Sequence, residues 1–179
     1  MKKEKQKLAQ EIYKSSHLIG KFILRSGVES AEYFDKYLFE TKPALLKKIC
    51  FEMSKLIPKN TEILAGLEMG GIPLATVLSQ KTGLSSLFVR KKAKKYGTRK
   101  LAEGGNINGK KIVLIEDVVT SGGQIILSVQ ELRALGAKIK TVLCVIDREA
   151  GGVKNLAEVG LKLKPLFTMS ELKKSALEK

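Results

Sequence analysis

The sequence predicts an α/β fold, in which a central, mostly parallel sheet is flanked by helices. The first observation is that strand-like and helix-like segments alternate from residue 62 onward, as they do around parallel sheets covered on both faces. The second is that Gly70-Gly71 and Gly122-Gly123 each join a strand-like segment to a helix-like one. The third is size, because 179 residues, 44% of them apolar, suit a single domain with a sizeable core.

The elements near the N-terminus are less regular. Apolar residues at helical spacing predict a helix within residues 2–18. Pro43 is tolerated in the first turn of a helix, so an amphipathic helix at 42–57 is expected to start after Thr41. Extended structure is expected between these helices, at residues 22–27 and 32–39.

From residue 62 the segments follow one another regularly. Short apolar runs predict strands at 62–68, 86–91, 111–117, 141–147 and 162–168. Apolar residues with a helical period predict helices at 72–83, 124–136 and 170–179, the last with Ser170 as its N-cap. A parallel sheet of this kind binds its ligands beyond the carboxyl ends of the strands.

The chain carries 33 Lys and Arg residues against 18 Asp and Glu, a net charge of +15. This excess predicts a polyanionic partner, which charge alone leaves open as nucleic acid, anionic lipid or a phosphorylated small molecule. Seven basic residues and no acidic one fall between Arg90 and Lys100. They belong to an apolar-poor stretch, residues 91–109, that predicts a mobile functional loop.

Signals for membrane targeting and for redox chemistry are weak. The sequence has no run of about 18 apolar residues, and its basic N-terminus lacks the apolar region of a signal peptide, so a cytoplasmic protein without a membrane partner is expected. Cys50 and Cys144 belong to no C-x-x-C or Cys/His pattern, which favours two buried, reduced thiols over a disulfide or a zinc site.

The most specific chemistry lies in the stretch VLIEDVVTSGGQ, residues 113–124. A Thr/Ser/Gly turn that opens a helix binds anions through its backbone N–H groups and the helix dipole, so residues 120–124 are expected to hold a phosphate. Neither G-x-x-x-x-G-K-[ST] nor G-x-G-x-x-G is present, which disfavours nucleoside triphosphates and dinucleotides. Glu116 and Asp117, at the end of the strand, are suited to ribose hydroxyls or a hydrated magnesium ion, or form an ordinary solvated strand end.

This stretch resembles the phosphoribosyl-diphosphate signature of the type I phosphoribosyltransferases. Four further segments are similar, in the same order, to the orotate-using members of that family: GKFILRSGVESAEYFD, GLEMGGIPLA, VRKKAKKYGTRKLAEGG and VIDREAGG. The resemblance implies the type I phosphoribosyltransferase fold for a single domain at 1–179. It also implies a small N-terminal hood for base recognition at 1–40 and a flexible catalytic loop at 92–109.

The implied activity is transfer of phosphoribosyl from 5-phosphoribosyl 1-diphosphate to orotate, which gives orotidine 5′-monophosphate and diphosphate in de novo pyrimidine biosynthesis. Magnesium (Mg2+) is the implied cofactor, held mainly by the donor's diphosphate rather than by protein ligands, and a homodimer with shared active sites is the implied assembly. Two alternatives stay open. One is a phosphoribosyltransferase for another base, and the other is a non-catalytic regulator of the same fold that binds nucleic acid through its positive charge.

The resemblance also implies roles for individual residues. Around the donor's ribose and 5-phosphate it places Glu116, Asp117, Thr120, Ser121, Gly122, Gly123 and Gln124. Facing the diphosphate it places Arg90, Lys91, Lys94 and Tyr96, and it implies catalytic roles for Lys94, Tyr96 and Asp117. Toward the base it places Tyr33, Phe34 and Arg148, whose planar guanidinium suits the orotate carboxylate, with Arg25 facing either the base or the diphosphate.

Three places depart from the family pattern. Gly70 stands where several members carry a diphosphate-binding lysine, and Tyr96 stands where histidine is usual. Residues 28–31 lack the basic and proline residues that are common near the orotate. Lys92 and Lys95 are candidates to supply the charge that position 70 lacks.

Overall fold

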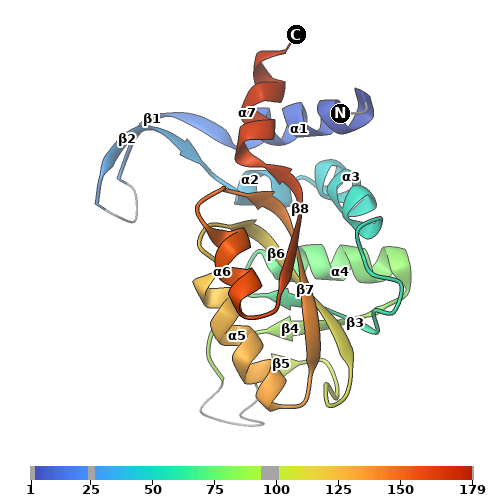
Figure 1. The fold of residues 1–179 in the computed structure, drawn as a ribbon. Helices are drawn as coiled ribbons and strands as arrows, with labels where there is room; N and C mark the ends of the chain where they lie inside the picture. The colour runs from blue at the N-terminus through green and yellow to red at the C-terminus, as the bar shows by residue number, and fades with distance from the viewer. Residues whose placement is uncertain (1–2, 24–26, 94–100, 179) are drawn as a thin grey trace.

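The computed structural model describes residues 3–23, 27–93 and 101–178. A six-stranded sheet lies at its centre (Figure 1), made of β3 (Ile63–Leu67), β4 (Ser85–Val89), β5 (Ala102–Glu103), β6 (Lys111–Val119), β7 (Lys138–Asp147) and β8 (Lys162–Thr168). Their order is β5-β4-β3-β6-β7-β8, and all neighbours are parallel except β5, which pairs antiparallel with β4. The predicted α/β class and mostly parallel sheet are confirmed.

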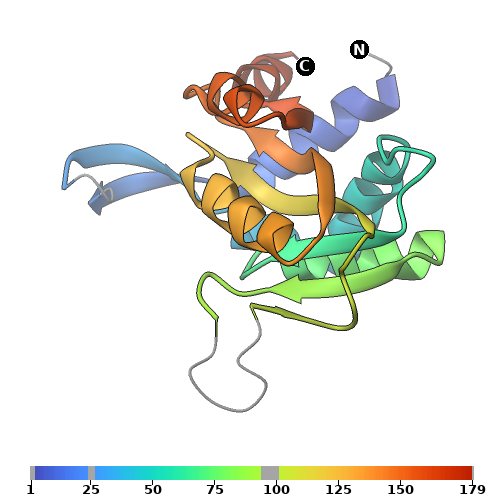
Figure 2. The ribbon, with the colours of Figure 1, turned by 60° about the horizontal axis from the view of Figure 1, so that its bottom comes forward.

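Helices cover both faces of this sheet (Figure 2), which is why its strands are apolar on both sides. One layer contains α1 (Lys3–Ser16), α3 (Pro43–Ser54), α4 (Gly71–Thr82) and α7 (Met169–Leu177). The other contains α5 (Gly123–Ala134) and α6 (Gly152–Glu158). In β6, Val113 and Ile115 pack against the first layer, whereas Ile112 and Leu114 pack against the second, as the alternation of a strand requires.

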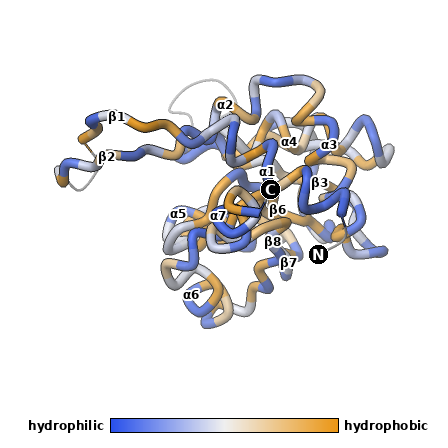
Figure 3. Tube along the Cα trace, turned by 90° about the horizontal axis from the view of Figure 1, so that it is seen from above, coloured by the Kyte–Doolittle hydropathy of each residue, from blue (hydrophilic) through white to orange (hydrophobic). Residues whose placement is uncertain are grey.

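A two-stranded hairpin precedes the sheet in the chain. It consists of β1 (His17–Ile23) and β2 (Glu29–Phe34), which pair antiparallel. The hairpin projects from the body of the protein (Figures 1 and 3), and its Ile19 and Ile23 side chains are 86% and 78% exposed. After β2 the chain enters α2 (Tyr37–Glu40), a single turn that buries Phe39 and Glu40.

Some local predictions are wrong. Residues 32–39 are not extended throughout, because the chain turns after Asp35, whose Oδ1 accepts a hydrogen bond from the first N–H of α2 at 3.0 Å. The cap of α7 is Thr168 rather than Ser170: its hydroxyl accepts a hydrogen bond from the Glu171 N–H at 3.1 Å, and the Glu171 carboxylate accepts one from the Thr168 N–H at 2.9 Å. The short elements α6 and β5 were not predicted at all.

Both cysteines are buried and free, as predicted. Burial raises the pKa of Cys50 to about 12 and that of Cys144 well above its usual value, which keeps both thiols protonated. Among the described residues, none of the helices has the length and apolar character needed to cross a membrane.

Candidate functional site

The carboxyl end of β6 carries the acidic pair. This strand lies in the middle of the sheet, between β3 and β7. Asp117 is buried, and its Oδ1 accepts a hydrogen bond from the Val118 N–H at 2.5 Å. Glu116 is partly exposed, and its Oε1 accepts a hydrogen bond from the Asp117 N–H at 3.0 Å. Both carboxyl groups are therefore held by local backbone at the point where the strand ends.

The turn at 120–124 joins β6 to α5 and includes the first two residues of that helix, Gly123 and Gln124. Gly122 has a φ of 79°, a left-handed conformation that favours glycine, and a Cβ there would lie 3.1 Å from the Leu156 side chain. The other four residues of the turn are exposed to solvent. Because the first N–H groups of a helix have no partner within it, this turn can bind an anion such as phosphate.

Helix α6 braces this turn from the neighbouring loop. The Asn155 Nδ2 donates a hydrogen bond to the backbone oxygen of Ser121 at 2.9 Å. Gly152, the first residue of α6, lies so close that a Cβ would be 2.7 Å from the backbone oxygen of Thr120. A glycine is therefore required where α6 meets the turn, which gives the second glycine of the segment REAGG a physical role.

Arg148 directly follows β7 at the same edge of the sheet. Val119 of β6 lies opposite Asp147 of β7, and the Arg148 N–H donates a hydrogen bond to the Val119 oxygen at 2.8 Å. Arg148 itself is exposed. The structure thus brings three of the predicted groups together: the acidic pair, the turn at 120–124 and Arg148.

A second turn, residues 68–70 between β3 and α4, lies against the acidic pair from the adjacent strand. A Cβ at Gly70 would collide with Oδ2 of Asp117 and would lie 2.9 Å from Oε1 of Glu40. A lysine therefore has no room at position 70 in this arrangement. A positive charge comes instead from Lys36, whose Nζ lies 2.5 Å from Oδ2 of Asp117.

Burial and ion pairing set the charges of this cluster. Burial by itself raises the pKa of Asp117, but its hydrogen bond with Glu116 and its ion pair with Lys36 hold that pKa below the usual value. Burial and the neighbouring Asp117 raise the pKa of Glu116 well above its ordinary value and that of Glu40 to about 8. Burial alone would lower the pKa of Lys36, but Asp117 raises it. The ammonium group of Lys36 therefore lies beside an ionised Asp117, and the surroundings favour the protonated forms of Glu116 and Glu40.

The two aromatic residues predicted to face the base lie differently on the hairpin. Tyr33 is 43% exposed, and its ring centre lies 5.5 Å from that of Phe22. Phe34 packs against the core, with its ring centre 6.3 Å from that of Tyr13. Tyr33 is therefore the more open of the two rings. Arg25 lies outside the described residues.

The predicted diphosphate-facing residues follow β4. Arg90 is the first residue after this strand, and its Nε lies 3.9 Å from Oε1 of Glu103 in β5. Lys91 is exposed. Both residues follow the strand next to β3, at the edge of the sheet where the second turn also lies. Lys94 and Tyr96 lie outside the described residues.

The sequence-based predictions missed Lys36 and Glu40. Their spacing was an available signal, because a lysine and a glutamate four residues apart share one face of a helical turn. The prediction of an extended segment at residues 32–39 excluded a helical turn there, so this spacing was not considered. Their contact with Asp117 had no local signal, since it joins segments far apart in the chain.

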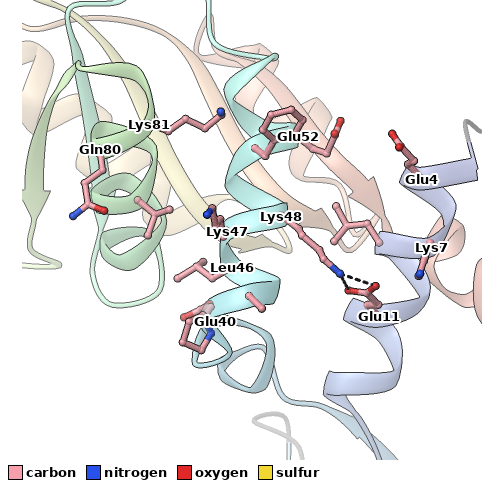
Figure 4. Close-up of a pocket in the computed structure, with 15 residues that line it drawn as sticks. Glu4, Lys7, Glu11, Glu40, Leu46, Lys47, Lys48, Glu52, Gln80 and Lys81 are labelled. Carbon is pink, nitrogen blue, oxygen red and sulfur yellow. Dashed lines mark hydrogen bonds and ion pairs between the residues drawn. The ribbon is translucent and has the colours of Figure 1, made fainter.

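A groove of about 1200 Å³ lies between α1, α3 and α4 (Figure 4). Its floor is largely apolar and its rim is charged, with the Lys48 Nζ 2.7 Å from Oε2 of Glu11. Glu40 belongs both to this groove and to the cluster around Asp117. Neither residues 120–124 nor Arg148 line the groove. The strand ends, rather than this groove, therefore bring the predicted site residues together.

The acidic residues at the strand ends do not build a metal cage of their own. In residues 3–23, 27–93 and 101–178, no three His, Cys, Asp or Glu side chains gather in a way that would hold a metal ion. Asp117 is moreover paired with Lys36. A magnesium ion at this site would therefore be held mainly by a diphosphate ligand and by its own waters, which the carboxyl groups of Glu116 and Asp117 could contact through hydrogen bonds.

Comparison with known sequences gives a consistent family. A family model described as "Phosphoribosyl transferase domain" matches residues 39–165. An orotate phosphoribosyltransferase from a Nocardioides species is 50% identical over 165 residues, which cover 92% of this chain and 92% of that relative. One from Methanocella arvoryzae is 45% identical over 153 residues, which cover 86% of this chain and 87% of that relative.

Solved structures share the fold. The crystal structure of Mycobacterium tuberculosis H37Rv orotate phosphoribosyltransferase in complex with Fe(III) dicitrate matches with a TM-score of 0.85 and 26% identity, over 94% of this chain and 98% of that one. The structure of that enzyme with 5-phospho-α-D-ribosyl 1-diphosphate matches with a TM-score of 0.81 and 23% identity, over 95% of this chain and 99% of that one.

Proposed function

We infer that this chain, which belongs to the phosphoribosyltransferase family, is an orotate phosphoribosyltransferase. It transfers the phosphoribosyl group of 5-phosphoribosyl 1-diphosphate to a ring nitrogen of orotate. The bond between ribose C1 and the diphosphate breaks, a bond between C1 and the ring nitrogen forms as that nitrogen gives up its proton, and orotidine 5′-monophosphate and diphosphate leave. This product belongs to pyrimidine biosynthesis. The observation that carries the proposal is the meeting of the acidic pair, the turn at 120–124 and Arg148 at one edge of the sheet.

The geometry of the strand ends supports a division of roles. Glu116 and Asp117 hydrogen-bond the ribose hydroxyls, and the turn at 120–124 binds the 5-phosphate through its backbone N–H groups. Arg148 pairs with the orotate carboxylate, because a planar guanidinium matches a carboxylate with two parallel hydrogen bonds. Its exposed position beside the turn supports this role. The base-side residues of the proposal are Arg25, Tyr33 and Phe34.

The leaving group sets the remaining requirement. Transfer passes through a positively charged ribosyl centre and releases a multiply charged diphosphate, so neutralising that anion and excluding water contribute more than proton transfer. The proposal assigns this task to Arg90, Lys91, Lys94 and Tyr96, and the position of the first two beside the turn after β3 supports it. Magnesium, carried mainly by the donor's diphosphate, supplies further positive charge to the leaving group when bound.

We also propose that the enzyme works as a cytoplasmic homodimer with shared active sites. The projecting hairpin supports this assembly, because Ile19 and Ile23 are large apolar side chains exposed along it. Light scattering coupled to size-exclusion chromatography is expected to give twice the mass of the chain. A monomer at the concentration of the activity assay would contradict the proposal.

A turnover assay with a panel of bases tests the function. With 5-phosphoribosyl 1-diphosphate and magnesium, the protein is expected to convert orotate to orotidine 5′-monophosphate and to leave uracil, adenine and hypoxanthine unchanged. Chelation with EDTA is expected to stop the reaction, and added magnesium to restore it. Reaction of another base without reaction of orotate would refute the substrate assignment. Salt-dependent binding of nucleic acid without any turnover would favour a regulator instead.

A further inference from the structure

The cluster around Asp117 contains a lysine that the roles above leave unused. The Lys36 Nζ lies 2.5 Å from Oδ2 of Asp117, and the Lys36 side chain is 33% exposed whereas that of Asp117 is fully buried. The same Nζ lies 5.2 Å from the centre of the Tyr37 ring. A buried carboxylate depends strongly on its cation, because removing one partner of a buried pair leaves an uncompensated charge.

We propose that Lys36 is a positioning residue for phosphoribosyl transfer, whose ammonium group holds the Asp117 carboxylate in place at the end of β6, where the donor's ribose binds. The inference rests on the proposed function, which gives Asp117 its contact with the ribose. Gly70 makes the arrangement possible, since a side chain at that position would displace Oδ2 of Asp117 from Lys36. The charge beside the ribose site thus comes from the segment before α2, not from the turn after β3.

The backbone around Lys36 is fixed by the end of α1. The Asp35 N–H donates a hydrogen bond to the Ser16 oxygen at 2.8 Å, and the Ser15 hydroxyl donates one to the Leu38 oxygen at 3.1 Å. Lys36 stands between these two anchors, so its Cα is held while its side chain reaches across to β6. A residue that positions another must itself be fixed, and Lys36 meets this condition.

Titratable groups from three elements surround Asp117. Glu116 of β6, Lys36 and Glu40 in and before α2, and Cys144 of β7 interact with Asp117 itself, whereas Asp35 acts on Glu40 and Asp147 acts on Cys144. Lys36 is the cation in this set of described residues. Burial acts to raise the pKa of Asp117, and the ion pair with Lys36 acts to lower it. Removing the ammonium group is therefore expected to raise that pKa and to protonate Asp117 at a higher pH.

Donor binding measured across pH tests the proposal without any base present. Calorimetric titration with 5-phosphoribosyl 1-diphosphate and magnesium compares wild type, Lys36→Met and Lys36→Arg. Lys36→Met is expected to weaken donor binding by about tenfold at neutral pH. It is also expected to shift the acidic limit of binding upward by about one pH unit. Lys36→Arg keeps the charge and is expected to recover most of the affinity and the wild-type pH profile.

Lys48→Met is the matched control, because it removes the ion pair with Glu11, at 2.7 Å, on the rim of the groove. It is expected to bind the donor as wild type does. In steady-state kinetics, Lys36→Met is expected to raise KM for the donor more than it changes KM for orotate.

Two results would overturn the proposal. One is a wild-type pH profile and affinity in Lys36→Met. The other is an equal loss at every pH that Lys36→Arg does not rescue, which assigns Lys36 a structural role alone. Thermal melting shows which variants are folded, and Lys36→Arg keeps the comparison possible if Lys36→Met is not. Failure of the proposed function looks different, because wild type would then bind the donor without transferring its phosphoribosyl group to orotate.

Discussion

Gly70 packs directly against Asp117, and a Cβ at position 70 would overlap Oδ2 of that buried carboxylate and lie 2.9 Å from Oε1 of Glu40. The turn after β3 can therefore pack this closely against the end of β6 only because position 70 has no side chain. This close contact explains why glycine rather than lysine stands at position 70. A longer residue there would displace the Asp117 carboxylate from its ion pair with Lys36.

Gly70→Ala is expected to destabilise the protein by about 1–3 kcal/mol, the usual range for overpacking a well-packed site. It should also weaken donor binding, because Asp117 must move. Urea unfolding and titration with 5-phosphoribosyl 1-diphosphate measure the two effects. Gly20→Ala is the control, since a Cβ there would meet only the Phe22 ring, at 3.2 Å. Equal losses of stability and of donor affinity in the two variants would contradict the close packing of Gly70 against Asp117.

Asp117→Asn is expected to leave the fold intact and to lower kcat/KM for the donor by about 100-fold, because hydrogen bonds to a charged group contribute about 1.5–3 kcal/mol. Steady-state kinetics with varied donor measures the loss. The control is Glu62→Gln, just before β3, whose carboxylate accepts a hydrogen bond from the Lys111 N–H at 2.9 Å at the opposite end of β6. Wild-type kinetics in Asp117→Asn would remove this residue from the site.

Arg148→Lys is expected to raise KM for orotate about tenfold and to leave KM for the donor nearly unchanged, because lysine cannot form the paired hydrogen bonds of a guanidinium. Lys154→Ala, which removes an exposed positive charge on α6, controls for general electrostatic attraction. If Lys154→Ala raises KM for orotate as much as Arg148→Lys does, the proposed carboxylate contact is wrong.

Stability should depend on pH through Glu40. Its pKa rises from 4.5 to about 8 on folding, so the neutral form is favoured in the folded state. The associated stability is complete below pH 4.5 and is lost as the pH rises toward about 8. Relative to Glu40→Gln, wild type is expected to lose on the order of a few kcal/mol across this range, at about 1.4 kcal/mol per pKa unit. Urea unfolding of both proteins at several pH values measures this loss. The same pH dependence of the unfolding free energy in wild type and Glu40→Gln would contradict the prediction.

Thr168→Ala is expected to lower the free energy of unfolding by about 1 kcal/mol, because it removes the N-cap of α7 and half of its capping box. Ser170→Ala, two residues on, is expected to lose less than half as much. Thermal and urea unfolding compare the variants directly. A larger loss of unfolding free energy in Ser170→Ala than in Thr168→Ala would identify Ser170 as the N-cap of α7 instead.

The features predicted correctly depend on patterns within short segments. Strand β8 covers residues 162–168 as expected, and β6 is recognisable because it is apolar on both faces before its acidic end. The turn at 120–124 could also be predicted from a short segment, because its Thr, Ser and Gly residues are consecutive in the sequence. Hydrophobic periodicity and a local sequence motif were sufficient to place these two strands and this turn.

The features that were missed depend on contacts between distant segments. Helix α6 has seven residues and is positioned by packing against the turn at 120–124, which no local pattern specifies. The role of Lys36 depends on its approach to Asp117 across the molecule. Arg25, Lys94 and Tyr96 lie outside the described residues, so their roles remain predictions.

The pairing of β4 with β5 has a consequence for how this enzyme can change. Phe88 pairs with Glu103 and Val89 with Ala102, and the Arg90 N–H donates a hydrogen bond to the Leu101 oxygen at 2.9 Å. The segment between these paired residues therefore leaves the sheet and rejoins it at one place, beside the edge strand β5. Doubling the length of a loop adds only about 0.6 kcal/mol of closure entropy. Evolution or design can therefore change the length and sequence of the segment between Arg90 and Leu101 while the register of the sheet stays the same.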